Sequence, residues 1–407
     1  MSWEKVTIKS ISKQIRGVSY TPKDVSDTPI DNYLRLLRAN NITENGIDLT
    51  DTVYVNRKCI SETQKLKVGD ILIVASSGSI KIVGKAILIE NQINSTFGAF
   101  CKVIRPNEKV DHRYLSYYFR SSDYRRKISH LAAGANINNL RNEDLDNLLI
   151  PLPPLATQKR IAKILDAADA LKRKDQQLLK KYDELAQAIF IDMFGDPVKN
   201  EKGWEVKKLK DISSKIHSGN TPKGGSNVYV KNGITFFRSQ NVWKNNLVYN
   251  DIAFIDDKIH KSMIKSSLKY KDILMTKTGR INTENSSLGR AALFVGEDDS
   301  ANVNGHVYLI RLLKDQVHEF VLQILTSKQY RDLIREVCVG GIDKRQLNKD
   351  HIEEFPIIYP PLKSQIKYSE LLGLLNSQKK GSEKVALNSE KIFNSLIQKA
   401  FNGELVN

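Results

Sequence analysis

The sequence contains an internal repeat, because features of its first half return in the same order in its second half, about 200 residues later. Each repeat opens on a Trp-Glu pair, passes through matched strand-like and helix-like segments, and closes on a Pro-Pro-Leu tripeptide. So many matches in one order make chance an implausible explanation and predict two copies of one fold. The matched segments are Trp3-Glu4 with Trp204-Glu205, Gly17–Pro22 with Gly219–Pro222, Leu36–Ile42 with Phe236–Val242, Leu66–Leu72 with Leu268–Leu274, Gly84–Ala86 with Gly289–Ala291, Tyr124-Arg125 with Tyr330-Arg331, Gly134–Leu140 with Gly341–Leu347, and Pro153–Leu155 with Pro360–Leu362.

A long helical segment follows each Pro-Pro-Leu, since proline suits the first turn of a helix and stops the element before it. Apolar residues then recur at alternating steps of three and four, which is typical of a coiled-coil seam, with Asp175 interrupting the first one. A helix from Leu155 to Phe194 would be about 60 Å long, and we expect the second helix to pair with it in antiparallel orientation. Gly195–Pro197 should end the first helix, and Gly381 should weaken the second. The predicted seam residues are Ile161, Ile164, Ala168, Leu171, Leu178, Tyr182, Leu185, Ile189, Leu371, Leu375, Val385, Ile392 and Leu396.

The segments between the helices mix short alternating runs with helical pieces such as Arg113–Leu131, which predicts an α+β fold. We therefore expect two homologous domains with bent β-sheet cores, separated by two long antiparallel coiled-coil helices in a pseudo-twofold arrangement. The expected boundaries are residues 1–152 for the first domain, 153–197 for the first long helix, 198–359 for the second domain and 360–407 for the second long helix.

The charge of the chain indicates an anionic partner. Lys plus Arg number 63 against 46 Asp plus Glu, which gives a net charge of +17, and nucleic acid is the first candidate. The sequence holds no run of about 18 apolar residues and no signal peptide, so we expect no membrane and a cytoplasmic protein. Cys59, Cys101 and Cys338 are too far apart in sequence for a CxxC motif and are interpreted as reduced, buried thiols.

The helix-entry motif carries the most specific resemblance to a known family. It reads Leu152–Leu155 followed by Gln158 in the first repeat, and Tyr359–Leu362 followed by Gln365 in the second. The plan of domain, Pro-Pro-Leu and long helix, occurring twice, resembles the specificity subunits of type I restriction-modification systems over essentially the entire chain. That family usually has an acidic residue before the glutamine. Thr157 and Ser364 stand there instead, and both residue types can cap a helix.

The resemblance implies a DNA-binding subunit that performs no chemistry. Its two target-recognition domains would each bind one half of a split, asymmetric site in double-stranded DNA, with the helices as a spacer. Two like domains related by a twofold axis suit half-sites about one helical turn, roughly 34 Å, apart. Two methyltransferase subunits would pack on the helices, and restriction subunits would join outside. S-adenosylmethionine, ATP and magnesium would belong to these partners, which supply DNA adenine methyltransferase and ATP-dependent endonuclease activity. No cofactor or metal is expected on this chain.

Polar and basic loop residues are the candidates for DNA contact, because Arg, Lys, Asn, Gln, Ser and Thr read base edges and hold phosphates. In the first repeat the candidates are Tyr20, Thr21, Lys23, Arg38, Asn40, Asn41, Ser76, Ser77, Ser79, Lys81, Asn136, Asn138 and Asn139. In the second repeat they are Thr221, Lys223, Arg238, Gln240, Asn241, Trp243, Lys244, Lys277, Thr278, Arg280, Asn282, Lys344, Arg345 and Gln346.

Two interpretations of these candidates stay open from sequence alone. Any one of them could be a solvated loop or turn residue, because polar residues usually lie outside. Two pairs stand out from the other candidates because the same residue occurs at the matching position of both repeats: Arg38 with Arg238, and Asn41 with Asn241. A repeated residue could read DNA in both halves, or it could buttress the shared scaffold. The apolar stripe of the helices likewise shows pairing and says nothing about DNA.

Motifs for catalysis on this chain fail on inspection. Gly78–Lys85 has five residues between its glycines where a phosphate-binding loop has four, and Ala86 replaces the Ser or Thr that binds magnesium. Asp251, Asp256 and Lys258 crudely resemble a metal-nuclease grouping, but no Pro-Asp precedes them and the first repeat has no copy. We interpret that segment as a solvated turn.

Two rival functions remain at this stage. A two-domain coiled-coil adaptor for proteins would show no salt-sensitive affinity for duplex DNA, whereas a DNA-binding protein loses affinity steeply as salt rises. An enzyme acting on DNA alone would methylate or cleave without partners. Within the favoured class, a methylation-only complex and a restriction system are not distinguished by this sequence.

Overall fold

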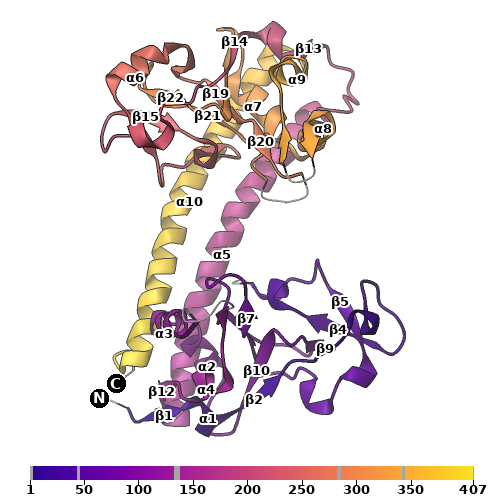
Figure 1. The fold of residues 1–407 in the computed structure, drawn as a ribbon, viewed down its shortest axis with the longest axis vertical. Helices are drawn as coiled ribbons and strands as arrows, with labels where there is room; N and C mark the ends of the chain where they lie inside the picture. Colours follow the sequence, from indigo (N-terminus) through magenta and orange to yellow (C-terminus); the bar gives the residue numbers. More distant parts are fainter. Residues whose placement is uncertain (1–2, 44–45, 133–137, 282–285, 342–343, 407) are drawn as a thin grey trace. The chain divides into compact units, whose positions relative to one another are not determined.

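The structure of the chain, a computed structural model, describes residues 3–43, 46–132, 138–281, 286–341 and 344–406. These residues form two compact units (Figure 1). Unit 1 comprises residues 1–179 and 381–407, and unit 2 comprises residues 180–380. Each unit therefore holds one globular domain together with part of each long helix. The expected domain boundaries, which place the helices in segments of their own, stay a prediction.

Unit 1 is built on a four-stranded antiparallel sheet with the order β2-β10-β6-β8. A second sheet has the order β3-β5-β4-β9, in which β4 and β9 run parallel. Two strand pairs, β1 with β12 and β7 with β11, complete the domain. The elements are β1 (Lys5–Thr7), α1 (Ile8–Ile11), β2 (Ser12–Arg16), β3 (Val25–Ser26), β4 (Tyr33–Leu37), β5 (Val53–Asn56), β6 (Ile71–Val74), β7 (Ser76–Ser77), β8 (Ala86–Leu88), β9 (Ser95–Phe97), β10 (Cys101–Pro106), α2 (His112–Tyr118), α3 (Ser122–Ala132), β11 (Asn138–Asn139), α4 (Asn142–Asp146) and β12 (Leu149–Pro151).

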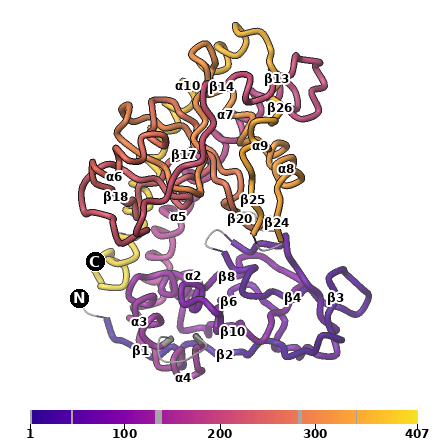
Figure 2. Tube along the Cα trace, turned by 45° about the horizontal axis from the view of Figure 1, so that its top comes forward, coloured from indigo at the N-terminus to yellow at the C-terminus, as the bar shows by residue number. Residues whose placement is uncertain are grey.

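Unit 2 repeats the strand order of the main sheet and of three strands of the second sheet, and Figure 2 traces both units. Among the described residues, β3 has no matching strand in unit 2, and β16, β17 and β24 have none in unit 1. The main sheet of unit 2 has the order β14-β23-β19-β21, and β18-β15-β22 matches β5-β4-β9, again with one parallel pair. The α+β fold with two homologous domains is therefore confirmed. The elements are β13 (Val206–Lys208), β14 (Ser213–Ser218), β15 (Ile234–Phe237), β16 (Val242–Trp243), β17 (Asn246–Leu247), β18 (Ala253–Ile255), α6 (Asp257–Ser262), β19 (Ile273–Thr276), β20 (Thr278–Gly279), β21 (Ala291–Leu293), β22 (Ala301–Val303), β23 (Val307–Leu312), α7 (His318–Thr326), α8 (Lys328–Val337), β24 (Val339–Gly341), β25 (Lys344–Gln346), α9 (Lys349–Glu353) and β26 (Pro356–Ile358).

A bidentate ion pair recurs inside both domains. In unit 1, Arg105 Nε and Nη2 donate to the Asp70 carboxylate at 2.7 and 2.8 Å. In unit 2, Arg311 makes the same two bonds to Asp272 at 2.8 and 2.7 Å. Both aspartates are buried, so each pair fixes the turn before the central strand to the strand beside it.

The two long helices begin where the Pro-Pro-Leu motifs predict. Helix α5 spans Leu155–Phe194 and α10 spans Leu362–Asn402, which continues through Gly381 without a break. The buried Gln158 and Gln365 side chains donate back to the carbonyls of Pro153 and Pro360, each at 2.8 Å, and so hold the helix entry. Gly195 ends α5 with a positive φ of 79°, as the sequence predicts.

Each domain sits on the helices through its own set of side chains. In unit 1, Ile161, Ala162 and Leu165 of α5 pack with Phe393 and Ile397 of α10 and with α2. In unit 2, Phe190 and Phe194 of α5 join Tyr368 of α10 and Phe320 of α7 in an aromatic cluster with ring centroids 4.9–6.5 Å apart. The helices thus contribute directly to both cores.

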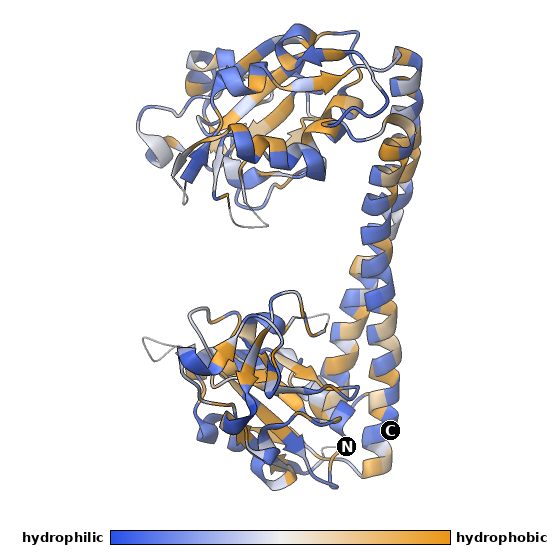
Figure 3. Ribbon diagram, turned by 90° about the vertical axis from the view of Figure 1, so that its right-hand side faces the viewer, coloured by the Kyte–Doolittle hydropathy of each residue, from blue (hydrophilic) through white to orange (hydrophobic). Residues whose placement is uncertain are grey.

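Burial along the predicted seam is uneven, and Figure 3 shows apolar and polar residues alternating along both helices. Ile161, Ala168, Ile189 and Leu396 belong to the two cores or pack against them. Ile164, Tyr182 and Leu375 are half-buried. Apolar burial concentrates where the domains rest on the helices, and the predicted seam as a whole stays a prediction. The exposed seam residues are Leu171, Leu178, Leu185, Leu371, Val385 and Ile392.

Cys101 and Cys338 are buried, as predicted, whereas the prediction that Cys59 is buried is wrong, because this residue is half-buried. Among the described helices, none has the length and apolar character that crossing a bilayer requires.

Candidate nucleic-acid interface

The predicted contact residues fall on three loop groups in each domain. The first group follows β2 or β14, the second follows β4 or β15, and the third joins the segment after β6 or β19 to β11 or β25. Tyr20, Thr21, Lys23, Thr221 and Lys223 belong to the first group. Thr21 also closes a short 3-10 turn, since its hydroxyl and backbone N–H both donate to Asp24. Asn136 and Asn282 lie outside the described residues.

Asn41 and Asn241 have the same scaffold role in the two units. Their side chains are 1% and 0% exposed. Asn41 Oδ1 accepts from the Arg38 backbone N–H at 2.8 Å, and Asn41 Nδ2 donates to the carbonyls of Asp48 and Asp51, both at 2.8 Å. Asn241 makes the matching bonds to Arg238, Val248 and Asn250. The structure favours the buttress interpretation for this pair, and contact with DNA stays a prediction.

Arg38 and Arg238 each hold an aspartate at the end of the same loop. Arg38 Nη2 lies 2.9 Å from the Asp51 carboxylate, and Arg238 Nη2 lies 3.1 Å from that of Asp251. Asn40 and Gln240 donate to the same two carboxylates at 2.6 and 3.0 Å. Asp251 is thus engaged by the repeat scaffold, and Asp256 caps α6 by accepting from the Ile259 N–H. Among the described residues, no group of three or more His, Cys, Asp or Glu could hold a metal ion.

Short strand pairs bring together loops that are far apart in sequence. In unit 1, β7 and β11 pair Ser77 with Asn138 and Ser76 with Asn139. In unit 2, β20 and β25 pair Thr278 with Gln346 and Gly279 with Arg345. These strand pairs therefore place described candidates of the third loop group side by side in each domain. Ser79 and Lys81 follow β7 directly, and Lys277 precedes β20 with its ammonium 5.5 Å from the Tyr308 ring.

Unit 2 gathers five of its predicted residues around one cleft of about 480 Å³. They are Gln240, Trp243, Thr278, Arg280 and Lys344. None of the described residues that line this cleft is acidic, whereas Arg280, Lys344 and the additional Arg290 are cationic. Its electrostatics therefore suit an anion. Lys244 lies in the turn after Trp243 and does not line the cleft.

Arg290 is the functional candidate that the sequence interpretation missed. Its guanidinium carbon lies 3.7 Å from the centroid of the Trp243 ring, an arrangement worth about 0.5–1 kcal/mol at an exposed site. Arg290 Nε donates to the Ser286 carbonyl at 2.9 Å, and Trp243 Nε1 donates to the Gln240 carbonyl at 3.1 Å. Burial, and then the charge of Arg331, lower the pKa of Arg290 below its ordinary value. Its repeat match, Lys85, is also cationic and was the available signal.

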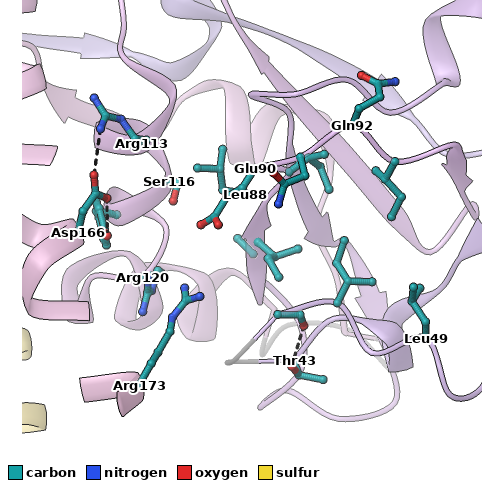
Figure 4. A pocket seen from close by; sticks show the side chains of 18 of the residues that line it. Thr43, Leu49, Leu88, Glu90, Gln92, Arg113, Ser116, Arg120, Asp166 and Arg173 are labelled. Carbon is teal, nitrogen blue, oxygen red and sulfur yellow. Dashed lines mark hydrogen bonds and ion pairs between the residues drawn. The ribbon is translucent and has the colours of Figure 1, made fainter. Parts of the chain in front are cut away.

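A second cavity, of about 430 Å³, lies in unit 1 between the domain and α5 (Figure 4). Its helical wall carries Arg113, Arg120, Asp166 and Arg173, and Leu49 and Gln92 lie on the opposite side. Its cations are largely compensated. Arg113 lies 3.0 Å from Asp166, and Arg120 and Arg173 share a second carboxylate, that of Asp169. None of these residues was a predicted DNA contact.

Asp169, one turn along α5 from Asp166, is the partner of both remaining arginines. Its carboxylate is 5% exposed and accepts from Arg120 at 2.6 and 3.0 Å and from Arg173 at 2.7 Å. Burial alone would raise the pKa of Asp169, but the bonds and charges of Arg120 and Arg173 outweigh it and lower that pKa. This cluster fastens the domain of unit 1 to its helix.

The two repeats correspond to two matches with one family model. A model described as the type I restriction modification DNA specificity domain matches residues 1–181 and again residues 201–387. The chain belongs to this family. The StySPI type I restriction enzyme specificity subunit of Salmonella potsdam is 30% identical over 420 residues, covering 99% of this chain and 89% of that protein. The EcoKI specificity subunit of Escherichia coli (strain K12) is 29% identical over 420 residues, with the same coverage of 99% and 89%.

Solved structures support the fold of this specificity subunit. The type I restriction-modification S subunit from M. genitalium has a TM-score of 0.52 at 16% identity, covering 98% of this chain and 96% of that chain. A chain from a study of complex assembly and conformational transition of a type I restriction-modification system has a TM-score of 0.51 at 16% identity, covering 99% and 98%. The family assigns this chain a recognition role, and its members are non-catalytic subunits.

Proposed function

We propose that each domain of this specificity subunit reads one half of a split DNA site. The observation that supports this is the same strand order in both domains combined with different residues on the matched loops. Unit 2 has Trp243, Thr278 and Arg280 where unit 1 has Thr43, Ser77 and Ser79. A shared scaffold with different polar side chains suits two different half-sequences, and therefore an asymmetric site.

The exposed apolar residues of α5 and α10 are the proposed docking surface for two methyltransferase subunits, and restriction subunits would join that assembly. Three leucines of these helices are largely open to solvent. Leu374 is 69% exposed, and Leu171 and Leu387 are each 52% exposed. Exposed apolar side chains that gather on one helix face suit a protein interface. In this proposal S-adenosylmethionine, ATP and magnesium bind to the partners, which supply the methyl transfer and DNA cleavage. The complex would act in the cytoplasm.

The first test is to express the chain with the methyltransferase encoded beside it and to map methylated sites in the host DNA. We expect one split motif to become methylated only when this chain is present. A partner that co-purifies without any new motif would favour a protein adaptor instead. Binding of the purified complex to duplex DNA should also weaken steeply as salt rises, because each neutralised phosphate releases counterions.

Docking is tested separately on the helix surface. Leu374→Glu should abolish co-purification with the methyltransferase while leaving the unfolding midpoint unchanged, since the side chain is mostly solvated. Ile264→Glu is the matched control, because Ile264 is a 53% exposed apolar residue on the domain of the same unit. Equal retention of the partner by both variants would contradict helix docking.

A further inference from the structure

The cleft of unit 2 differs in chemistry from the matched surface of unit 1, and the difference centres on one pair of side chains. Trp243 lies at the end of β16 and is 41% exposed, so one part of its indole is open to solvent. Its ring carries the guanidinium of Arg290, whereas the matched positions in unit 1 hold Thr43 and Lys85. Unit 1 therefore cannot form this stack.

The stack is held in place from both sides. The β16-β17 hairpin pairs Trp243 with Asn246, and the indole N–H is anchored on the Gln240 carbonyl. Arg290 is anchored through its Nε on Ser286, so the ordering of this long side chain is established before any ligand binds. A preorganised guanidinium loses less conformational entropy on binding than a free one.

We propose that Arg290, positioned by Trp243, reads a guanine in the half-site bound by unit 2. A guanidinium presents parallel N–H donors that match guanine O6 and N7, and this is the commonest specific contact in the major groove. The cationic Arg280 and Lys344 beside it suit the neighbouring phosphates, and no described lining residue is acidic to repel them. Trp243 acts as a positioning residue. This inference rests on the proposed function and adds the base that is read and the residue that reads it.

The test uses the complete complex of this chain with its methyltransferase and duplexes carrying the mapped motif. Each guanine of the motif is replaced, one at a time, by 7-deazaguanine, which lacks the N7 acceptor. With the wild-type chain, at least one replacement should weaken binding by about 5- to 150-fold, the range for a bidentate base contact. Arg290→Lys, which keeps the charge but replaces the planar pair of donors by a point charge, should reduce the sensitivity at one such guanine and leave the others unchanged.

Further variants separate reading from folding and from phosphate contact. Trp243→Ala should weaken the same single-guanine sensitivity, and Trp243→Phe should restore part of it because an aromatic face remains. Arg335→Ala is the control, since Arg335 is an arginine of unit 2 that pairs with Asp332 away from the cleft. Unfolding midpoints should match the wild type in Arg290→Lys, Trp243→Phe and Arg335→Ala, and should fall slightly in Trp243→Ala, which loses the stack.

Three results would overturn the inference. The motif could lack a guanine whose replacement matters, Arg290→Lys could leave every sensitivity intact, or it could weaken all duplexes equally, as loss of a phosphate contact would. These outcomes differ from failure of the proposed function, in which no split motif is methylated or bound at all. That last result would overturn both.

Discussion

Substitution of Asp169 by asparagine tests how the domain of unit 1 is fastened to α5. The carboxylate is 5% exposed and accepts three hydrogen bonds from two arginines, Arg120 and Arg173, whose side chains are 22% and 37% exposed. Removing one partner of a fully buried ion pair costs about 3–5 kcal/mol. Because both arginines reach some solvent, we expect Asp169→Asn to lower the free energy of unfolding by about 2–3 kcal/mol.

Asp166→Asn is the matched control on the same helix. Asp166 and its partner Arg113 are 38% and 37% exposed, so their ion pair should contribute about 0–1 kcal/mol. Tyr117 Oη donates to Asp166 at 2.8 Å, and an asparagine oxygen can still accept that bond. The assay is urea unfolding of the full chain, monitored with a spectroscopic probe placed in unit 1. Equal midpoints for the two variants would refute the burial argument.

The same comparison has a defined pH dependence. Arg120 and Arg173 lower the pKa of folded Asp169 below that of the unfolded chain, so its stabilising contribution is fully present above the unfolded pKa of about 3.9. It is lost as the pH falls through the lowered, folded pKa. The difference between wild type and Asp169→Asn should therefore be constant near neutral pH and shrink only under strongly acidic conditions.

Three further predictions follow from the scaffold and the helix. Asn241→Ala should destabilise unit 2 by about 1–3 kcal/mol in urea unfolding, since it removes the buried amide that accepts from the Arg238 N–H and donates to the Val248 and Asn250 carbonyls; an unchanged midpoint would contradict this. Gly219→Ala should lower the melting temperature because its Cβ would lie 2.3 Å from the Val303 carbonyl oxygen, whereas Gly373→Ala, with open space around it, should raise stability by about 0.5–1 kcal/mol. A four-residue insertion in the middle of Ile161–Ile189 adds about 6 Å of helix and should lengthen the spacer of the methylated motif by one or two base pairs, and an unchanged spacer in an active complex would refute the ruler hypothesis.

The repeat made the fold predictable, because two copies of one pattern constrain each other. It predicted the α+β character, the helix starts at Pro-Pro-Leu and the end of α5 at Gly195. Strand order and register were beyond the sequence, since they depend on contacts between segments such as β4 and β9, which are about 60 residues apart. The sequence also offered no reason for the recurrence of Gly17 and Gly219 at matching positions. Their absent side chains leave room for the Gly98 and Val303 carbonyls of neighbouring segments.

The candidate site was predicted by loop and only partly by residue. Repetition selected Asn41 and Asn241, and the structure gives both a scaffold role, because a residue kept in two domains that read different sequences serves what those domains share. Trp243 was predicted from its position, but its stacking partner Arg290 lies 47 residues further on, across the sheet. No local pattern reports such a contact.

The two domains also rest on the helices through different chemistry, and this bears on how they can be exchanged. In unit 1, Arg113 of α2 and Arg120 of the turn after it form ion pairs with α5. The matching residues of unit 2 are Glu319 and Thr326, so unit 2 has no copy of these ion pairs. A foreign domain grafted over residues 1–150 alone would leave Asp169 buried without its arginine Arg120. A longer graft would also exchange the helix segments of unit 1, residues 153–179 and 381–407. It would keep the contacts between each domain and its helices intact. Such an exchange should change one half of the methylated motif, whereas the shorter graft should lose stability first, and a change in both halves would show that the domains do not read DNA independently.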